Sequence, residues 1–463
     1  MTSGPSSGGP SSHEALAGLS DPLEIQPVHG PLNAVVRLPG SKSITNRALI
    51  CAALSRGTST LRGVLHSDDT AAMVGCLEDL GISLTSVGDT VTVVGSAGRV
   101  PNAPATLDAR QSGTTARFML ALAALAEAEI TIDGHAQLRA RPMRDGIDAV
   151  RALGCSVADS GGCLPVTVGP GPGPSAAAAS ASSGSSESTM SERSLVRVRG
   201  DVSSQFLTGL LLAAPCVPGG LSVEVDGHLQ SVPYVAMTVA VMAAFGASVE
   251  VGANFGRFEV ADTGYSACDY PIEPDASAAS YPLAAAALCG GTVVVEGLGA
   301  ASVQGDVRFA EVLAAYGAEV TIEPDRITVR GAALRGGTFD LADISDTAQT
   351  LAAIAPFAEA PTEILGIGFI RRKETDRVAA MVGELRRLGI DAHELDDGLR
   401  IVPGPLKPAV VQTYDDHRMA MSFALVGLRS DGVSIADPGC VAKTFPTYWR
   451  MLAQLAASAE ERS

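Results

Sequence analysis

The chain has 463 residues, 46% apolar and 18% charged, which is typical of a globular protein with two large or three smaller domains. Its 33 basic residues against 50 acidic ones give a net charge of −17, which argues against non-specific binding to nucleic acid or to an anionic membrane. No apolar run of about 18 residues occurs, so no membrane-spanning helix is expected.

Two segments rich in Gly, Pro, Ala and Ser fall outside the expected folded core. Residues 1–12 are predicted to form a disordered tail, and residues 169–194 a flexible insertion. The tail has the features of neither a secretory signal nor a transit peptide. The eight cysteines are scattered without any Cys-x-x-Cys pair, and the seven histidines form no ligand cluster. This pattern favours reduced thiols, a cytoplasmic location and no metal site.

Six short segments are apolar almost all round, which is typical of buried helices. Each follows a polar start, near Ser43, Ser112, Ser203, Ser277, Ser345 and Asp415, where Ser and Asp are suitable N-caps. The apolar bodies are Ala48–Leu54, Phe118–Leu125, Phe206–Ala214, Tyr281–Leu288, Thr350–Ala358 and Met419–Leu428.

A second element recurs between these helices. It is a helical stretch that ends in a hydrophobic residue and a glycine, followed by a strand hairpin, and the glycines are Gly81, Gly154, Gly246, Gly317 and Gly389. Their spacings are 73, 92, 71 and 72 residues, and the long one contains the insertion. Glycine suits the left-handed position after a helix. The chain is therefore predicted to consist of six repeats of one helix and strand unit.

The sixth repeat has a helix near 447–457 but no hairpin after it, so we expect the early strand Asn33–Leu38 to complete it. The sequence then predicts an α/β fold with three repeats per domain, buried parallel helices inside and sheets outside. One domain is discontinuous, formed by residues 13–39 and 274–463, and the other spans residues 40–273.

Charged side chains gather at the starts of the buried helices. Helix N-termini carry free N–H groups and a partial positive charge, so parallel helices would form an anion-binding floor. The basic residues at or after these starts are Lys42, Arg47, Arg117, Arg141, Lys373, Arg377, Arg418 and Lys443. Ordinary surface charge is the alternative explanation for any one of them. As a set in an acidic protein, they indicate small polyanionic substrates.

At these positions the sequence resembles the 5-enolpyruvylshikimate-3-phosphate synthases, which are enolpyruvyl transferases. The matching segments occur in family order from about residue 30 to residue 455. They are Leu38–Arg47, Ser112–Arg117, Arg139–Pro142, Ser203–Phe206, Glu273–Ser277, Gln304–Asp306, Arg372–Arg377, Asp415–Met419 and Asp437–Pro446. The family fold has two domains with three-fold repetition that close on the substrate.

The resemblance implies transfer of the enolpyruvyl group of phosphoenolpyruvate to the 5-hydroxyl of shikimate 3-phosphate, with release of phosphate. The reaction is an addition followed by an elimination, in the shikimate pathway to aromatic amino acids. It requires a base, an acid and cations, and no metal or organic cofactor. The expected partners are these two small substrates, without nucleic acid or membrane, and the expected state is a monomer.

The resemblance also implies residue roles, beginning with shikimate 3-phosphate. Ser203, Ser204, Ser231 and Lys42 would bind its phosphate. Ser43 and Arg47 would hold its carboxylate and ring, and Gln205 would contact the ring. Asp346 would hold the 4- and 5-hydroxyls, and Lys373 belongs to the same binding set.

The implied phosphoenolpyruvate pocket is lined by Lys42, Gly113, Arg117, Arg141, Gln205, Arg377, Arg418 and Lys443. Asp346 would accept the hydroxyl proton, and Glu374 would give and then remove the methyl proton. Lys42, Lys443 and His417 complete the catalytic set. The structural alternatives to these roles are that Asp346 caps the fifth helix and that Glu374 forms an ion pair with a nearby arginine.

Two positions depart from the common family pattern. Gln111 and Ser112 stand where many members have Asn-Ala, and Phe118 stands where many have proline. Both departures lie on the phosphoenolpyruvate side, where the inhibitor glyphosate binds in this family. Because Gly113 is retained, we expect a glyphosate-sensitive or intermediate enzyme.

Two other functions stay open at this point. One is enolpyruvyl transfer to UDP-N-acetylglucosamine, a related enzyme that usually relies on a cysteine near the second helix, whereas residues 108–135 contain none. The other is a catalytically dead protein that only binds a phosphorylated ligand. Such a protein would be expected to have lost Asp346, Glu374 or Lys42, and all three are present.

Overall fold

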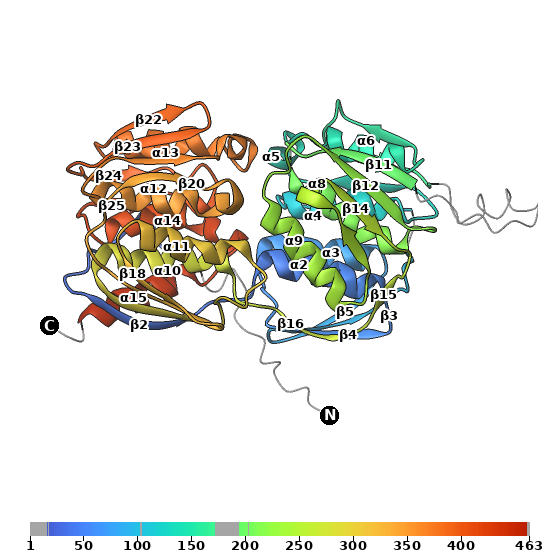
Figure 1. Cartoon of the computed structure of the whole chain (residues 1–463), viewed down its shortest axis with the longest axis horizontal. Helices are drawn as coiled ribbons and strands as arrows, with labels where there is room; N and C mark the ends of the chain where they lie inside the picture. The colour runs from blue at the N-terminus through green and yellow to red at the C-terminus, as the bar shows by residue number, and fades with distance from the viewer. Residues whose placement is uncertain (1–15, 17, 102–103, 172–193, 202, 461–463) are drawn as a thin grey trace, which may run out of the picture. The chain divides into compact units, whose positions relative to one another are not determined.

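The computed structural model describes residue 16 and residues 18–101, 104–171, 194–201 and 203–460. The expected tail at 1–12 and residues 172–193 of the expected insertion lie outside this part. The described residues form two compact units (Figure 1). Unit 1 is Lys42–Ile272, and unit 2 joins the described residues up to Ser41 to the chain from Glu273 onward. None of the helices in the described ranges has the length and apolarity needed to cross a bilayer.

Unit 1 contains three repeats of the order strand, buried helix, strand, outer helix and hairpin. The first comprises β16 (Asp269–Pro271), α2 (Lys42–Leu54), β4 (Thr58–Arg62), α3 (Asp68–Asp79), β5 (Ser83–Val87) and β6 (Thr90–Val94). The second comprises β7 (Ala105–Asp108), α4 (Gly113–Ala123), β8 (Ile130–Asp133), α6 (Arg144–Ala152), β9 (Val157–Asp159) and β10 (Val166–Val168). The third comprises β11 (Ser194–Arg199), α8 (Ser204–Ala213), β12 (Leu221–Asp226), α9 (Val232–Ala244), β13 (Val249–Val251) and β14 (Arg257–Val260).

Unit 2 contains three further repeats, of which the sixth has a single strand in place of the hairpin. The fourth comprises β2 (Leu32–Arg37), α10 (Ala276–Cys289), β17 (Gly291–Glu296), α11 (Phe309–Ala315), β18 (Glu319–Ile322) and β19 (Arg326–Arg330). The fifth comprises β20 (Gly337–Asp340), α12 (Ala348–Ile354), β21 (Thr362–Leu365), α13 (Arg377–Arg387), β22 (Asp391–Leu395) and β23 (Gly398–Val402). The sixth comprises β24 (Ala409–Val411), α14 (His417–Gly427), β25 (Val433–Ile435), α15 (Tyr448–Glu460) and β1 (Leu23–Glu24).

Short elements connect these repeats. They are the parallel pair β3 (Ser55–Arg56) and β15 (Tyr265–Ser266), the one-turn helix α5 (Ala136–Arg139), and the 3-10 turns Ala214–Cys216, Ala253–Phe255, Gly305–Arg308, Ala342–Thr347, Ala355–Phe357, Gly368–Arg372 and Pro438–Lys443. Two of the turns bear on the site, because Ala342–Thr347 carries Asp346 and Pro438–Lys443 ends at Lys443.

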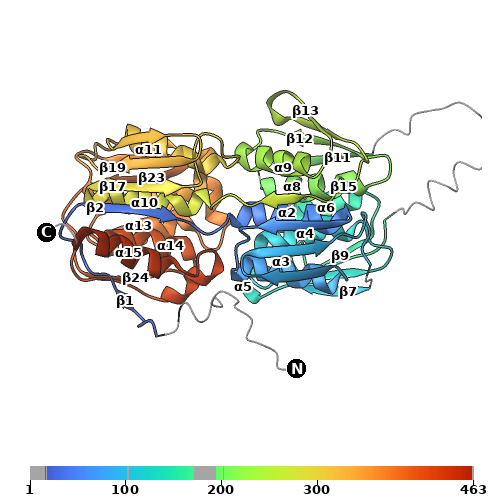
Figure 2. The same cartoon turned by 90° about the horizontal axis from the view of Figure 1, so that it is seen from below.

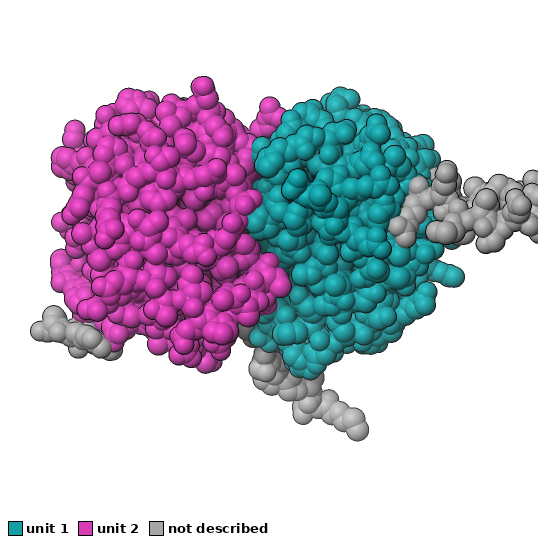
Figure 3. Space-filling model, in the orientation of Figure 1, with its two compact units in different colours: residues 1–9, 42–272 teal, residues 10–41, 273–463 magenta. Residues whose placement is uncertain are grey.

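The sheets of the repeats share one topology. In the order β7-β8-β10-β9, the first two strands are parallel and the other neighbours antiparallel, and four more four-stranded sheets repeat this arrangement. The sixth sheet has the order β1-β25-β24. In unit 2, for example, the buried helix α10 lies against β2 and β17 (Figure 2). Figure 3 gives the two units different colours. The predicted architecture of buried helices inside outer sheets is therefore what the structure contains.

The strand expected to complete the sixth repeat pairs elsewhere. β2 lies parallel to β17, with Val35 opposite Val294, and β1 joins the sixth sheet through Leu23 opposite Ile435. The expectation for Asn33–Leu38 was therefore wrong. β2 and β17 each have six residues and pair along their whole length, whereas β25 has only three. The fourth repeat thus begins with a strand that precedes α2 in the chain.

The five glycines after the outer helices all adopt the left-handed conformation. Their φ angles are 84° at Gly81, 90° at Gly154, 82° at Gly246, 121° at Gly317 and 88° at Gly389. Residues with a Cβ rarely adopt this conformation, so the glycine pattern marks where each helix must turn into its hairpin.

The six apolar segments form the buried helices, but several begin at other residues than expected. α14 is buried along all eleven residues. α10 is capped by Asp275, whose carboxylate accepts a hydrogen bond of 2.9 Å from the Ala278 N–H, while Ser277 lies inside the helix. α12 begins only at Ala348, after the 3-10 turn. At α10, Asp275 takes the cap position in place of Ser277. At α12, the 3-10 turn moves the start of the α-helix past Ser345.

Close packing of α8 on α4 gives a stability prediction. A Cβ at Gly209 would meet the Arg117 carbonyl oxygen at 2.9 Å, so Gly209→Ala forces the two helices apart. We expect a loss of about 1–3 kcal/mol in the free energy of unfolding, measured by urea denaturation. The matched control is Gly75→Ala in α3, where a Cβ meets nothing within 4 Å. This control should gain about 0.5–1 kcal/mol from helix propensity, and equal effects would contradict the packing argument.

Candidate active site

In unit 1, two arginines and a glutamine meet at the start of α4. An ideal Cβ on Gly113 would lie 2.6 Å from Arg141 Nη1 and 2.7 Å from Arg117 Nη1, so both guanidinium groups border this glycine. Arg117 Nη1 donates to Gln205 Oε1 at 2.8 Å, and its guanidinium also lies 5.1 Å from the Phe206 ring centroid. Gln205 Nε2 in turn donates to Thr114 Oγ1 at 3.2 Å. The group combines two cations with the N-terminus of α4, an arrangement suited to an anion.

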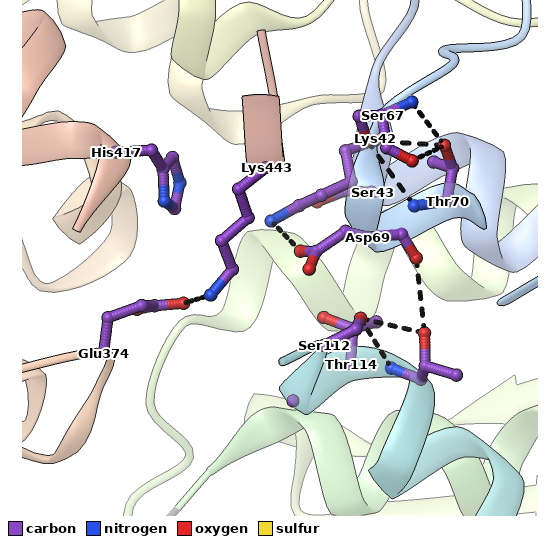
Figure 4. Close-up of polar contacts among 12 residues, drawn as sticks. Lys42, Ser43, Ser67, Asp69, Thr70, Ser112, Thr114, Glu374, His417 and Lys443 are labelled. Atoms are coloured by element: carbon purple, nitrogen blue, oxygen red, sulfur yellow. Dashed lines mark hydrogen bonds and ion pairs between the residues drawn. The ribbon is translucent and has the colours of Figure 1, made fainter. Parts of the chain in front are cut away.

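Lys42, at the start of α2, forms an ion pair with Asp69 at the start of α3 (Figure 4). The distance from Lys42 Nζ to Asp69 Oδ2 is 3.0 Å, and the side chains are 15% and 5% exposed. A capping box between Ser67 and Thr70 fixes this turn of α3. Thr115 Oγ1 of α4 donates to the Asp69 carbonyl at 3.5 Å. Asp69 therefore sets the position of the Lys42 ammonium.

Arg47 lies one turn further along α2 and is buried. Its Nε donates to Thr238 Oγ1 at 2.8 Å, and its Nη groups donate to the carbonyls of Ser43 and Tyr234 at 2.9 and 3.2 Å. Within the described part of the chain, Arg47 takes part in no ion pair with a carboxylate. Burial lowers the pKa of Arg47 to about 10, so the group is still charged at neutral pH. A buried cation held by neutral oxygens favours a nearby anion.

The three serines expected to bind phosphate lie at the starts of α8 and α9. Ser203 caps α8, where its Oγ accepts from the Gln205 N–H at 3.3 Å, and Ser204 is the first helical residue. Ser231 precedes α9 in the left-handed conformation, with φ of 56°, and its side chain makes no capping hydrogen bond. The two helix starts therefore present hydroxyl groups beside backbone N–H groups.

In unit 2, the centre of the cluster is the guanidinium of Arg377, which is 2% exposed and contacts three carboxylates. Its Nε lies 2.7 Å from Asp416 Oδ2, its Nη1 3.2 Å from Asp346 Oδ1, and its Nη2 2.9 Å from Glu374 Oε2. Burial opposes the charged form of Arg377, but the three carboxylates raise its pKa above the usual value. Three carboxylates, two from the fifth repeat and one from the sixth, are thus held by one side chain.

Asp346 is shared between two arginines. Arg418 Nη2 lies 2.7 Å from Asp346 Oδ2, and Arg418 Nη1 donates to the Asp346 carbonyl at 3.1 Å. The residue before α12 is Thr347, so Asp346 is not the cap of this helix. The capping alternative is therefore wrong, and the carboxylate of Asp346 faces Arg377 and Arg418.

Glu374 binds both Arg377 and Lys443. Figure 4 shows the Lys443 side chain reaching Glu374, and Lys443 Nζ lies 3.1 Å from Glu374 Oε1 (Figure 4). Both side chains are nearly buried, at 7% and 11% exposure. His417, the first residue of α14, is 1% exposed, and its Nδ1 is 3.7 Å from Asp416 Oδ1, too far for a hydrogen bond. Glu374 does form the expected ion pair with an arginine, Arg377, but this pair lies in a buried cluster and not on a solvated helix.

The charges of this cluster balance. Arg377, Arg418 and Lys443 contribute +3, and Asp346, Glu374 and Asp416 contribute −3, so their sum is zero. Within this cluster, therefore, each of the three cations has a carboxylate partner. An anion that binds these cations must compete with the carboxylates. Burial raises the pKa of nearby Tyr281 to about 12 despite Arg418, which keeps the phenol neutral.

The Nζ of Lys373 lies 6.0 Å from the centroid of the Phe369 ring. Two members of the site were not among the expected site residues. Asp416 caps α14 and binds Arg377, and its position directly before His417 was the available signal. Asp69 reads as an ordinary acidic residue in the first turn of α3, so nothing in the sequence links it to Lys42.

The six α/β repeats, with arginines, lysines and carboxylates at their helix starts, define an α/β protein with a site suited to small anions. The family model described as EPSP synthase (3-phosphoshikimate 1-carboxyvinyltransferase) matches residues 27–452. A 3-phosphoshikimate 1-carboxyvinyltransferase of Nostoc punctiforme is 42% identical over 94% of this chain and 99% of its own length. One of Shewanella amazonensis is 41% identical over the same shares. The chain belongs to the EPSP synthase family.

A solved structure of EPSP synthase from Acinetobacter baumannii superposes on this chain with a TM-score of 0.75. The superposition covers 93% of this chain and 97% of the other, at 24% sequence identity. At this identity the similarity concerns the fold. It confirms the two-domain α/β fold that the sequence predicted.

The role of Arg377 as the common partner of three carboxylates can be tested by unfolding. Arg377→Met leaves the fully buried Asp416 carboxylate without its partner, so we expect a loss of about 3–5 kcal/mol in urea denaturation. Arg371→Met is the matched control, because Arg371 pairs with Asp376 and Glu394 at the partly exposed surface. It should lose about 0–1 kcal/mol. Similar losses in both variants would show that the cluster does not depend on Arg377.

Proposed function

We propose that the two clusters described above carry out the reaction for which the relatives are named. The chain transfers the enolpyruvyl group of phosphoenolpyruvate to the 5-hydroxyl of shikimate 3-phosphate, and phosphate is released. The observation that carries this conclusion is the family match over residues 27–452, within which every expected site residue lies. The substrates are small anions, in agreement with the helix starts and buried cations of both units.

We assign shikimate 3-phosphate to residues of unit 1. The hydroxyls of Ser203, Ser204 and Ser231 lie at two helix starts, where N–H groups can also reach phosphate oxygens. Lys42 supplies a further charge to the phosphate, and Arg47 with Ser43 binds the carboxylate. Asp346 and Lys373 of unit 2 complete this assignment at the ring hydroxyls.

We assign phosphoenolpyruvate to two groups of residues. Arg117, Arg141 and Gln205 around Gly113 supply two guanidinium groups and an amide, which suit a carboxylate or phosphate. Arg377, Arg418 and Lys443 supply the other cations, and Lys42 contributes to both substrates. Because the cations of unit 2 are bound to carboxylates, the phosphate of the substrate must displace part of these ion pairs.

The proposed chemistry uses the carboxylates of unit 2. In the addition, Asp346 takes the proton of the 5-hydroxyl, the oxygen bonds to C2 of phosphoenolpyruvate, and Glu374 delivers a proton to C3. In the elimination, Glu374 takes a proton back from the methyl group, the C2–O bond to phosphate breaks, and the departing phosphate takes the proton held by Asp346. Lys443 stabilises the leaving phosphate, and the buried His417 lies beside Asp416 in the same cluster.

The ion pairs of Glu374 bear directly on its role as an acid. Two cations within 3.1 Å favour its ionised form when no substrate is bound. Delivery of a proton requires the neutral carboxyl. We therefore propose that the phosphate of the substrate draws Lys443 and Arg377 toward itself, which lets Glu374 take up a proton.

The proposed location is the cytoplasm, and the proposed state is a monomer. All eight cysteines lie within the described residues and are free thiols, which suits a reducing compartment. A mass near 47.1 kDa by light scattering in solution would support the monomer, and twice that mass would contradict it.

Phosphate release tests the proposed function. The purified chain should release phosphate only when phosphoenolpyruvate and shikimate 3-phosphate are both present. Glu374→Gln should lower kcat by about 10²–10⁴-fold while the chain still binds shikimate 3-phosphate, because the amide cannot transfer the proton. Glu363→Gln, on the surface strand β21, is the matched control and should leave kcat unchanged.

The alternatives give different results in the same assay. Binding of shikimate 3-phosphate without turnover would indicate the dead protein. Turnover only with UDP-N-acetylglucosamine in place of shikimate 3-phosphate would indicate the related transferase, and either result would overturn the proposal.

The contacts of Gly113 predict how a methyl group alters the phosphoenolpyruvate pocket. In Gly113→Ala, the new Cβ displaces the Arg117 and Arg141 guanidinium groups from their positions. We expect the KM for phosphoenolpyruvate and the inhibition constant of glyphosate both to rise by about tenfold, and the KM for shikimate 3-phosphate to stay constant. Gly75→Ala should change none of these constants. In the unaltered chain, a glyphosate inhibition constant far above the KM for phosphoenolpyruvate would contradict the expected sensitivity.

A further inference from the structure

A buried carboxylate outside the proposed catalytic set lies near the end of α13. Glu384 is completely buried and binds three donors: Tyr414 Oη at 2.7 Å, the Gln412 N–H at 2.9 Å and Arg387 Nε at 2.9 Å. Two of these donors belong to the segment between β24 and α14. Glu384 therefore ties α13 to the chain that leads into α14.

The two helices tied in this way both begin at the Arg377 cluster. Arg377 is the first residue of α13, two turns before Glu384. Asp416, His417 and Arg418, at the start of α14, begin two residues after Tyr414. The geometry of the cluster thus depends on how these two helix starts are held relative to each other within unit 2.

The chain before α14 adopts a strained conformation that needs such a support. Tyr414 and Asp415 both have left-handed φ angles, 57° and 55°, although neither is glycine. A bulky residue keeps this conformation only where its surroundings hold it. Tyr414 is 43% exposed, and its phenol donates to Glu384, which links this turn to α13.

We propose that Glu384 and Tyr414 are positioning residues that set Asp416 and Arg418 against Arg377 and Asp346. The two consecutive left-handed residues turn the chain so that the Asp416 carboxylate caps α14 and faces Arg377 at the same time. Loss of the hydrogen bond from Tyr414 lets this turn relax, and the guanidinium of Arg418 then moves relative to the Asp346 carboxylate. Burial and the neighbouring Glu384 raise the pKa of Tyr414, so the phenol remains a donor throughout the neutral range.

The inference rests on the proposed function, because Arg377 and Arg418 are assigned there to phosphoenolpyruvate. It predicts an effect on one substrate. In Tyr414→Phe, the KM for phosphoenolpyruvate should rise by about three- to tenfold. The KM for shikimate 3-phosphate should change less than twofold, because most of its assigned contacts lie in unit 1. Glu384→Gln should raise the same KM, since one amide oxygen replaces two carboxylate oxygens.

The matched control is Tyr316→Phe. Tyr316 is a buried tyrosine of unit 2 whose Oη lies 2.7 Å from Thr362 Oγ1, away from the cluster. Its loss should change the unfolding temperature but neither KM. A purely structural role for Tyr414 would likewise lower the stability or the active fraction and leave both KM values constant.

The decisive experiment is steady-state kinetics of phosphate release by the full chain and these three variants, with each substrate varied in turn. A rise of the phosphoenolpyruvate KM in Tyr414→Phe and Glu384→Gln alone supports the inference. An unchanged KM in Tyr414→Phe, an equal rise for both substrates, or the same rise in Tyr316→Phe overturns it while leaving the proposed function intact. Absence of turnover in the unaltered chain would instead overturn the proposed function, and the inference with it.

Discussion

The architecture is determined by six helices that are apolar almost all round and must therefore be shielded from water. A helix of this kind is stable in water only when other elements cover every side. In each unit the sheets and outer helices provide the cover, and the basic side chains of the buried helices lie in their first two turns. The starts of α2, α4 and α8 in unit 1, and of α14 in unit 2, are where Lys42, Gly113, Ser203 and His417 lie. The position of the site is thus a consequence of how the core is built.

The basic side chains at the helix starts have different partners in the two units. In unit 1, Lys42 is paired with the Asp69 carboxylate, whereas the buried Arg47 donates to neutral oxygens of Thr238, Ser43 and Tyr234, so Arg47 has capacity for an anionic ligand. In unit 2, every cation of the cluster binds a carboxylate, and the cluster is neutral as a whole. Unit 1 is therefore suited to hold a substrate anion, whereas unit 2 is suited to exchange protons and ion pairs when an anion arrives.

The sequence predicted the repeated part of the fold well because the signals are local. Periodic glycines mark helix ends through their φ angles, and apolar runs such as Met419–Leu428 mark buried helices. Strand pairing was harder, since β2 pairs with a strand more than 250 residues away and several partners fit its alternating pattern. Helix starts were also less certain, because Asp275 and Ser277 are both suitable caps and only the folded chain selects one.

The functional site was likewise predictable from the sequence only in part. The resemblance pointed to Arg377, Asp346 and Glu374, but no sequence pattern shows that one guanidinium binds all three carboxylates of the cluster. Asp69 and Glu384 escaped notice because their partners, Lys42 and Tyr414, are 27 and 30 residues away. Side chains that position other side chains carry no motif of their own. The roles assigned to these residues remain predictions.

In the proposed chemistry, C3 of phosphoenolpyruvate gains a proton to form a methyl group and then loses one, and Glu374 is assigned to both transfers. The most direct measurement is the reaction in deuterium oxide, with mass spectrometry of the product. A methyl group forms and loses a proton during turnover, so the account predicts deuterium in the vinyl group of the product. A product without deuterium in that group would contradict the account, because it would show that no exchangeable methyl intermediate is formed.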